Sequence, residues 1–192
     1  MRIGIDIDDV LNNLTECVLK VYNKDSGDHL LPINITEYDM KQFVKREYRD
    51  KFVSYFSDKR VWDIIKPNMT AFRLLNKLHN EGHSIYFVTA THPLNVKKKY
   101  LWLSKYLDWD CWDSLVVTKD KSLLTGLDIF VDDNLDNIGY KNDNNIVFIL
   151  YLQPWNILKD KTLEYLTMSG TKQESWDWFE QLVNILSEQR GG

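Results

Sequence analysis

The sequence predicts an α/β protein in which a parallel β-sheet carries helices on both faces. Two observations support this fold class. Short apolar segments of strand length occur at intervals along the chain, and between most of them lie longer segments whose apolar residues recur at helical spacing. This alternation is typical of parallel sheets covered by helices. The predicted strands are residues 2–7, 83–90, 114–118, 127–133 and 145–152.

Amphipathic helices are expected between these strands. The first follows an acidic turn, because apolar residues recur at helical spacing around and after Leu14. A second covers about residues 71–78 and ends near Gly82, a residue type that favours helix termination. Pro93 suits the first position of a third helix. A last helix is expected over the tract SWDWFEQLVNILSEQ near the end of the chain.

Residues 24–66 do not follow this alternation. They are rich in charged and aromatic side chains and predict short helices, but their pattern does not place them in the sheet. Ligands of open parallel sheets bind at the carboxyl ends of the strands, and an insertion after the first strand–helix unit can cover that edge. We therefore expect an α/β core of residues 1–23 and 67–192 and a small helical cap of residues 24–66.

The composition excludes several classes of protein. Hydrophobic residues make up 44% of the 192 residues, which indicates a folded chain. The net charge of −4 gives no general attraction to nucleic acid or to anionic membranes, and no apolar run reaches the roughly 18 residues of a membrane-spanning helix. Charges from Asp6 onward argue against a signal peptide. Cys17 and Cys111 are too few for a disulfide framework. We expect a cytoplasmic protein with free thiols.

Polar side chains follow four of the predicted strands. An acid pair follows the first strand, a threonine ends the second, lysines follow the third, and an acid pair ends the fourth. These residues are Asp6 and Asp8, Thr89, Lys119 and Lys121, and Asp132 and Asp133. Residues two apart on an extended segment face the same side, and the carboxyl ends of parallel strands lie along one edge of the sheet. The sequence therefore predicts that all four groups meet in one crevice.

Crowded carboxylates repel one another unless a cation offsets their charge. Mg²⁺ prefers oxygen ligands and is often held by one or two carboxylates together with a phosphate. A threonine hydroxyl and a lysine ammonium can bind the remaining phosphate oxygens. Each motif alone has an ordinary explanation as a solvated turn, a strand end or a surface lysine. The VDD strand end also resembles an ATPase metal site, but the sequence lacks a phosphate-binding GxxxxGK[ST] loop. The ordered set predicts a Mg²⁺-dependent phosphate site.

These motifs resemble a known family. The segments IGIDIDDVL, FVTAT and IFVDD, together with Lys121, resemble the four motifs of the haloacid dehalogenase (HAD) superfamily of phosphohydrolases. The likeness covers about residues 1–23 and 68–150. Within it, VVTKDKSLLTGLDIFVDD is similar to a stretch of the 5′(3′)-deoxyribonucleotidase family, and SWDWFEQL is similar to that family's closing helix. Asp9 stands where a glycine is usual, Lys119 where an arginine is common, and TAT where TSP is usual.

The resemblance implies a role for each acidic residue. Asp6 would attack phosphorus and form an aspartyl-phosphate. Asp8 would protonate the leaving group and then activate the water that hydrolyses this intermediate. Asp6 and the backbone carbonyl of Asp8 would bind Mg²⁺. Asp133 would supply the other protein ligand, with Asp132 beside it. Dehalogenases of the superfamily lack the second aspartate, so Asp8 favours phosphate ester chemistry.

The resemblance also implies what binds the substrate. Thr89, Ala90 and Lys121 would hold the transferring phosphoryl group. The expected partner is a small phosphate ester, in particular a nucleoside monophosphate and most specifically a pyrimidine deoxynucleotide. Cap aromatics can stack on a base or can form a small core within the cap. The candidates are Phe43, Phe56 and Trp62, with Phe43 first because KQFVKRE resembles the family's base-contacting segment.

Several alternatives stay open at this point. The substrate could be another small phosphate ester or a nucleic-acid end. A receiver-type phosphoacceptor domain uses similar groups, but its second acid cluster does not follow the lysine. A non-catalytic HAD protein is a further alternative. Asp9 is expected in a solvated or outer position, and Lys97–Lys99 is expected on a solvated helix face. His92 lies close enough to Thr89 in sequence to line the site.

Overall fold

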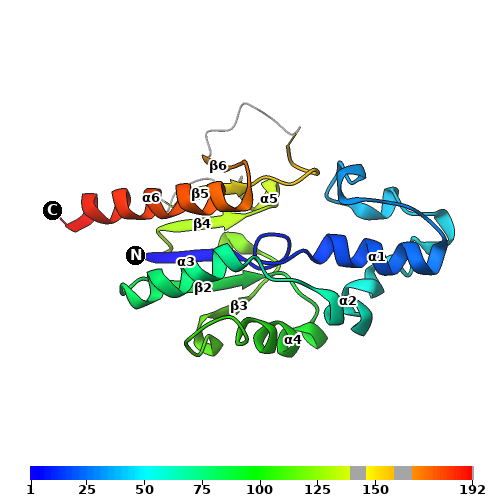
Figure 1. Ribbon diagram of the computed structural model, residues 1–192, viewed down its shortest axis with the longest axis horizontal. Helices are drawn as coiled ribbons and strands as arrows, with labels where there is room; N and C mark the ends of the chain where they lie inside the picture. The colour runs from blue at the N-terminus through cyan, green and yellow to red at the C-terminus, as the bar shows by residue number, and fades with distance from the viewer. Residues whose placement is uncertain (139–145, 158–165, 192) are drawn as a thin grey trace.

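The centre of the molecule is a six-stranded parallel sheet in the order β3-β2-β1-β4-β5-β6. The computed structural model describes residues 1–138, 146–157 and 166–191, and Figure 1 shows its strands side by side. The α/β fold class predicted from the sequence is confirmed. The strands are β1 (Arg2–Asp6), β2 (Ser84–Thr89), β3 (Leu115–Val117), β4 (Ile129–Asp132), β5 (Val147–Tyr151) and β6 (Leu166–Met168).

The last strand, β6, was missed by the sequence analysis. It has three residues, and two of them are exposed, so it contains no apolar run that would signal a strand. The other five strands fall within the predicted segments, although residue 145 of the predicted strand 145–152 lies outside the described residues. Strand prediction therefore succeeded where the sequence contains a continuous apolar run.

The register of the sheet sets the positions of the strand ends. Asp6, the last residue of β1, pairs with Val88 one residue before the end of β2. Thr89 pairs with Val117, and Asp132 pairs with Leu150. Since every pairing is parallel, these ends lie along one edge of the sheet. The first acid pair, the threonine and the second acid pair are thereby brought to a common edge.

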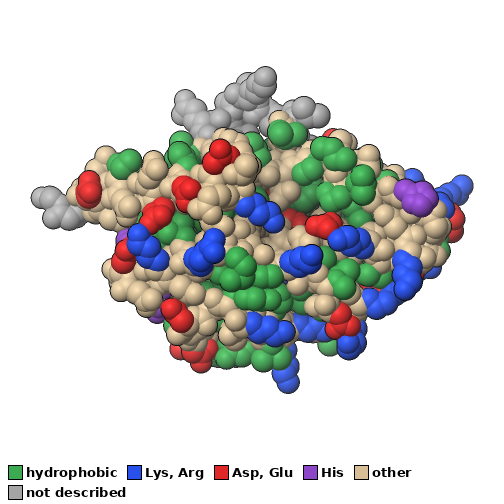
Figure 2. All heavy atoms as spheres, viewed as in Figure 1, with side chains coloured by type: hydrophobic (Ala, Val, Ile, Leu, Met, Phe, Trp, Pro, Cys, Tyr) green, Lys and Arg blue, Asp and Glu red, His purple; other side chains and the backbone are tan. Residues whose placement is uncertain are grey.

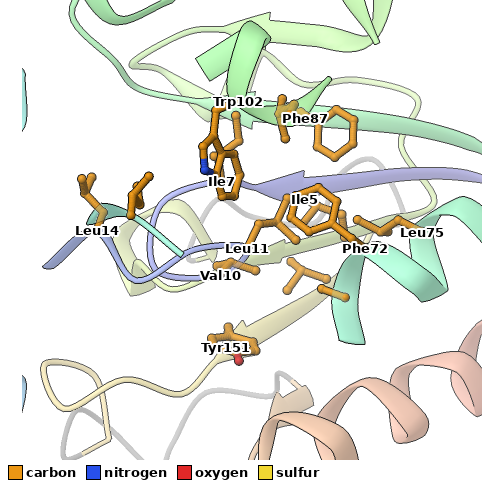
Figure 3. Packing of buried hydrophobic residues seen from close by; sticks show 14 of the residues in the cluster. Ile5, Ile7, Val10, Leu11, Leu14, Phe72, Leu75, Phe87, Trp102 and Tyr151 are labelled. Carbon is orange, nitrogen blue, oxygen red and sulfur yellow. The ribbon is translucent and has the colours of Figure 1, made fainter. Parts of the chain in front are cut away.

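Helices pack around the sheet and close its core. They are α3 (Met69–Asn80), α4 (Pro93–Leu103), the short α5 (Leu135–Ile138) and α6 (Lys172–Gly191). The side chain of Asn68 caps α3, and that of His92 caps α4. Side chains from β1, from the turn after it and from α3 form one apolar cluster, which includes Ile5, Leu11 and Phe72 (Figure 3). Among the described residues, no helix is both long and apolar enough to cross a bilayer.

Helix α1 (Leu14–Ser26) and residues 27–66 lie beyond the carboxyl ends of the strands (Figure 1). The helix ends at Gly27, whose φ of 64° is the left-handed conformation that glycine adopts most easily. Residues 27–66 form four 3₁₀ turns and one short helix, and both η4 and α2 pack against α1. These elements are η1 (Pro32–Asn34), η2 (Met40–Gln42), η3 (Arg46–Tyr48), η4 (Phe52–Ser57) and α2 (Lys59–Ile64).

Two chain crossings connect this segment to the core, and they run side by side. Asn12 forms an isolated antiparallel bridge with Pro67, and the Asn68 amide donates to the Leu11 carbonyl at 2.7 Å. The Lys66 amide donates to Asn13 Oδ1, also at 2.7 Å. The boundary of the cap at residues 24–66 stays a prediction. Because α1 packs against η4 and α2, we propose that this helix belongs with the cap.

Candidate active site

Lys121 links two strand ends at the centre of the site. It begins the 3₁₀ turn η6 (Lys121–Leu123), and its side chain is buried. Its ammonium forms ion pairs with Asp6 at the end of β1 and with Asp132 at the end of β4, the latter at 2.6 Å. A lysine that is almost fully buried is tolerated when it is paired in this way. The two predicted acid clusters and the predicted lysine therefore meet in one place.

The two aspartates after β4 differ in what they bind. Asp132 is fully buried and accepts hydrogen bonds from Lys121, from the amide of Asn134 at 2.9 Å and from Asn137 Nδ2 at 3.1 Å. Asp133 accepts from Trp155 Nε1 at 2.9 Å and lines the adjacent cavity. Asp132 thus orients the lysine and the turn, whereas the second carboxylate oxygen of Asp133 accepts no hydrogen bond from the described residues and can bind a ligand.

Asp8 is held by a lysine that the sequence analysis assigned to the wrong environment. Lys99 was expected on a solvated helix face, but it is only 1% exposed. Its ammonium forms an ion pair with the Asp8 carboxylate and donates to Thr89 Oγ1 at 2.6 Å. The expectation is therefore wrong for Lys99, although Lys97 is exposed. The spacing along α4 indicates this buried position. Lys99 precedes the buried Trp102 and Leu103 by three and four residues, so it lies on the same face of the helix.

Helix α4 also contacts the cap. Asn95 Nδ2 donates to the Phe56 carbonyl at 3.3 Å and to Ser57 Oγ at 3.0 Å. Lys98 Nζ donates to the Ser57 carbonyl at 2.9 Å. The helix that delivers Lys99 to Asp8 is therefore tied to the end of η4 on the other side of the site.

Asp9 has a structural role. Its φ of 59° is left-handed, a conformation that aspartate tolerates better than most residues other than glycine. Its carboxylate accepts from the Thr15 amide at 2.9 Å and from Thr15 Oγ1 at 2.6 Å. Of the two expected positions, the outer one therefore holds and the solvated one is wrong, since Asp9 ties the turn after β1 to the first turn of α1. Glycine would adopt this left-handed conformation more easily. In this chain, the hydrogen bonds between the Asp9 carboxylate and the following helix stabilise the conformation instead.

The electrostatics of the site indicate an excess of negative charge. Burial raises the pKa of Asp6 to about 7, although Lys121 opposes this effect and Asp132 and Asp8 add to it. Burial, followed by the charges of Asp132 and Asp6, raises the pKa of Asp133 well above its usual value. Lys121 therefore does not fully compensate the carboxylates, so a bound cation would stabilise their ionised forms.

The donor set fits a hard divalent cation. Asp6 and Asp133 line the same cavity, and burial together with the neighbouring carboxylates disfavours the ionised form of both unless a further cation is present. Within residues 1–138, 146–157 and 166–191, no group of three or more His, Cys, Asp or Glu side chains is placed to hold a metal ion by itself. Two carboxylates that a substrate phosphate and waters complete are typical of Mg²⁺ sites. The residues present therefore fit Mg²⁺ better than a metal that needs a full protein cage.

Two adjoining cavities lie between the strand ends and the cap. One, of about 500 Å³, contains Asp6, Asp133 and Lys121. The other, of about 470 Å³, contains Lys99 and Asn95. Residues shared by both are Asp8, Leu14, Val53, Phe56 and Ala90. Asp8 therefore stands where the two cavities meet, which is a suitable position for a group that acts on the bond between phosphate and leaving group.

The predicted cap residues are placed differently. Phe56 lines both cavities, and Trp62 lines the second, with its Nε1 donating to the Phe56 carbonyl at 3.0 Å. Phe43 packs, half-buried, against the hydrophobic core and is not among the described residues that line either cavity. His92 lines the second cavity while it caps α4. The structure brings Phe56 and Trp62 to the site and leaves Phe43 outside it.

The sequence analysis also missed residues that complete the site. Trp155 binds the Asp133 carboxylate, and Asn156 Nδ2 donates to the Asp133 carbonyl at 2.7 Å. Both follow β5, whose carboxyl end lies along the same edge of the sheet as the other strand ends, so their position after a strand was the available signal. Tyr38 reaches the first cavity from the cap, where no repeating pattern predicts which side chains face inward.

The comparisons with known proteins agree with this architecture. A family model described as 5′ nucleotidase, deoxy (pyrimidine), cytosolic type C matches residues 1–186. A 5′(3′)-deoxyribonucleotidase of Clostridium acetobutylicum is 30% identical over 158 residues, which cover 76% of this chain and 80% of that protein. Among solved structures, a hydrolase from Pseudomonas syringae has a TM-score of 0.60 at 12% identity, over 94% of this chain and 98% of the other.

A second solved structure carries the name of the wider fold family. This haloacid dehalogenase-like hydrolase from Streptococcus pneumoniae has a TM-score of 0.59 at 12% identity, over 93% of this chain and 97% of the other. At such low identity the likeness concerns the fold, and the family is shown by the match over residues 1–186. The chain belongs to the family of 5′-nucleotidases that this model describes, built on a HAD-like fold, and is a phosphomonoester hydrolase.

Proposed function

We propose that this protein is a Mg²⁺-dependent nucleotidase that hydrolyses deoxynucleoside monophosphates through an aspartyl-phosphate on Asp6. The observation that carries the proposal is the placement of Asp6 at the end of β1, in one cavity with Asp133, Lys121 and Thr89. A nucleophile, a second carboxylate for a cation, and two donors for phosphate oxygens thus share one space.

Asp6 is suited to attack phosphorus directly. A carboxylate is a nucleophile without help from a base once it is ionised. Mg²⁺, when bound by Asp6 and Asp133, would offset their charge and that of the phosphoryl oxygens. Lys121 holds Asp6 by an ion pair and can bind a phosphoryl oxygen from the same position. Attack by Asp6 displaces the ester oxygen of the leaving group.

Asp8 is suited to the two proton transfers. It lies at the junction of the cavities, where the leaving oxygen would emerge. In its protonated form it would give a proton to that oxygen, and the carboxylate that results would later take one from the water that hydrolyses the aspartyl-phosphate. Lys99 fixes its carboxylate in place together with Thr89. We propose Lys99 as a positioning residue, because it acts through Asp8 and Thr89.

The substrate class rests on the relatives and on the cap. The Clostridium relative is named a 5′(3′)-deoxyribonucleotidase, and the family description names pyrimidine deoxynucleotides. Phe56 and Trp62 offer aromatic faces next to Asp8 for a flat base. Stacking of a base on an aromatic side chain contributes about 1–3 kcal/mol. We also propose that the protein is located in the cytoplasm, as expected from the sequence.

A substrate panel tests the proposed function. Phosphate release is measured with dTMP, dUMP, ribonucleotides, sugar phosphates, a 5′-phosphorylated oligonucleotide and p-nitrophenyl phosphate. We expect the deoxynucleotides to have the highest kcat/KM, and EDTA to abolish activity until Mg²⁺ is restored. Preference for a sugar phosphate or for the oligonucleotide would contradict the substrate class. Full activity in EDTA would contradict the metal site.

The cap aromatics are distinguished by a pair of variants. Phe56→Ala should raise KM for dTMP about tenfold, as expected for the loss of about 1.4 kcal/mol of stacking. It should change hydrolysis of p-nitrophenyl phosphate much less, because a small ester needs no base contact. Phe43→Ala is the matched control, since Phe43 packs against the core. A larger effect on KM from Phe43→Ala than from Phe56→Ala would restore Phe43 as the base contact.

A further inference from the structure

Tyr38 is a cap residue that lines the same cavity as Asp6, Asp133 and Lys121. It lies between η1 and η2, and the chain on both sides of it is fixed. Ile35 is fully buried, and Asp39 caps η2 by accepting from the Lys41 amide at 3.1 Å. Met40 packs against the core, with its Sδ 4.0 Å from Thr15 Oγ1. Tyr38 is therefore presented to the cavity by an ordered turn.

The side chain of Tyr38 shares its cavity with two carboxylates of the site, those of Asp6 and Asp133. The residue as a whole is 50% exposed, yet burial is the main effect that raises the pKa of its phenol, followed by the charges of Asp133 and Asp6. A phenol carries its proton at neutral pH, so the group is a neutral hydrogen-bond donor.

This donor has no acceptor among the described residues, in contrast to neighbouring tyrosines of the cap. Tyr48 donates to the Asp25 carbonyl at 2.7 Å, and Tyr55 donates to Asp25 Oδ2 at 3.1 Å. No hydrogen bond from Tyr38 joins it to any residue in ranges 1–138, 146–157 and 166–191. A free hydroxyl in a cavity with a lysine and a threonine matches what a phosphoryl group needs, namely several donors around its oxygens.

We propose that the Tyr38 hydroxyl donates a hydrogen bond to an oxygen of the substrate's phosphoryl group, so that the cap contributes directly to phosphate binding. The inference rests on the proposed function, because it places a phosphate monoester between Asp6 and Asp133. It assigns to the cap a contact with the part of the substrate that is common to all phosphate esters. A contact with the base or sugar would instead be specific to nucleotides.

The test is Tyr38→Phe, which removes only the hydroxyl and keeps the ring. We expect kcat/KM to fall about ten- to a hundredfold, as for the loss of a hydrogen bond to a charged group. The fall should be equal for dTMP and for p-nitrophenyl phosphate, and the inhibition constant of inorganic phosphate should rise as well. Tyr48→Phe is the matched control, because it removes a cap hydroxyl that bonds away from the cavity, and it should stay within about twofold of the unmodified protein.

The other outcomes each overturn the inference. A fall for dTMP alone would place the hydroxyl on the nucleoside, and no fall for either ester would make Tyr38 a surface residue of the cap. A different result would refute the proposed substrate class without refuting the role of Tyr38. A protein that hydrolyses p-nitrophenyl phosphate but not nucleotides refutes that class, while the comparison of Tyr38→Phe with Tyr48→Phe still holds for the aryl ester. A protein that hydrolyses neither ester overturns both proposals.

Discussion

The core and the cap are built in different ways. The core is built on six strands in parallel register, with Ile3, Ile5 and Val131 fully buried at its centre. The cap has 3₁₀ turns, and its apolar contacts centre on the ring of Tyr22, which meets Phe52 and Tyr55 edge-on at 5.6 and 6.1 Å. The face in Figure 2 shows many Lys and Arg side chains at the cap end.

This difference separates two tasks. The core holds the groups that perform chemistry at fixed strand ends, where the sheet defines each position closely. The cap presents aromatic and polar side chains from turns, which tolerate change without disturbing the sheet. The molecule thus combines a rigid reaction centre with a cover whose residues can vary. Substitutions in the two regions should have unequal consequences.

The largest effect is expected at the end of β1. Asp6→Asn should lower kcat by at least about a thousandfold, because a neutral amide is a poor nucleophile and losing the nucleophile removes most of catalysis. Stability should not fall in parallel, since the change removes one of several crowded carboxylates. Steady-state phosphate release and a urea unfolding curve on the same preparation check both statements. Residual turnover near that of the unmodified protein would mean that the core does not supply the nucleophile.

A substitution in the core interior should affect stability first. Phe72→Ala should cost about 3–5 kcal/mol of unfolding free energy. Its ring is fully buried and contacts Trp102 and Tyr106, with ring centroids 5.5 and 5.1 Å apart. Ile33→Ala in the cap is the control, because Ile33 is 68% exposed and exposed sites usually change stability by less than about 0.5 kcal/mol. Equal shifts in the urea midpoint would show that the cap is as tightly packed as the core.

Lys99 lies on the side of the core that meets the cap, and we expect an intermediate effect there. Lys99→Met should lower kcat about ten- to a hundredfold, because Asp8 and Thr89 lose the ammonium that positions them. Stability should fall as well, because the change removes one partner of a largely buried ion pair and leaves the Asp8 carboxylate without its counter-charge. Lys97→Met is the matched control on the exposed side of α4. If both variants keep full activity, Lys99 is a structural residue.

The smallest effect is expected on the cap surface. Arg60 pairs with Asp25 and with Asp58, both at 2.7 Å, and its hydrogen bonds lower the pKa of each carboxyl. Their stabilisation is therefore present above the usual carboxyl pKa and is lost as pH falls through the lowered folded values. Arg60→Ala should shift the urea midpoint less than Phe72→Ala does at neutral pH. The difference should vanish in acid and shrink in high salt. A shift that persists in acid would point to packing by the arginine stem.

The sequence alone predicted most of the core and part of the site. The strand ends at Asp6, Thr89 and Asp132 were found because buried parallel strands are continuously apolar and end in polar residues. Lys99 was misjudged because a run of three lysines is typical of a solvated surface, and only the helical phase relative to Trp102 reveals the inward position. Tyr38 lies in a turn, where no period determines which side chains face inward.

Helix α4 has a consequence for recombining this enzyme with its relatives. One face of the helix reaches Asp8 and Thr89 through Lys99, and the same helix bonds to the end of η4 through Asn95 and Lys98. In a chimera that exchanges only residues 27–66, the new cap would pack against an α4 helix whose side chains match the original cap. The unit of exchange should be the cap together with α4, so that new substrate preferences are acquired with the element that holds Asp8.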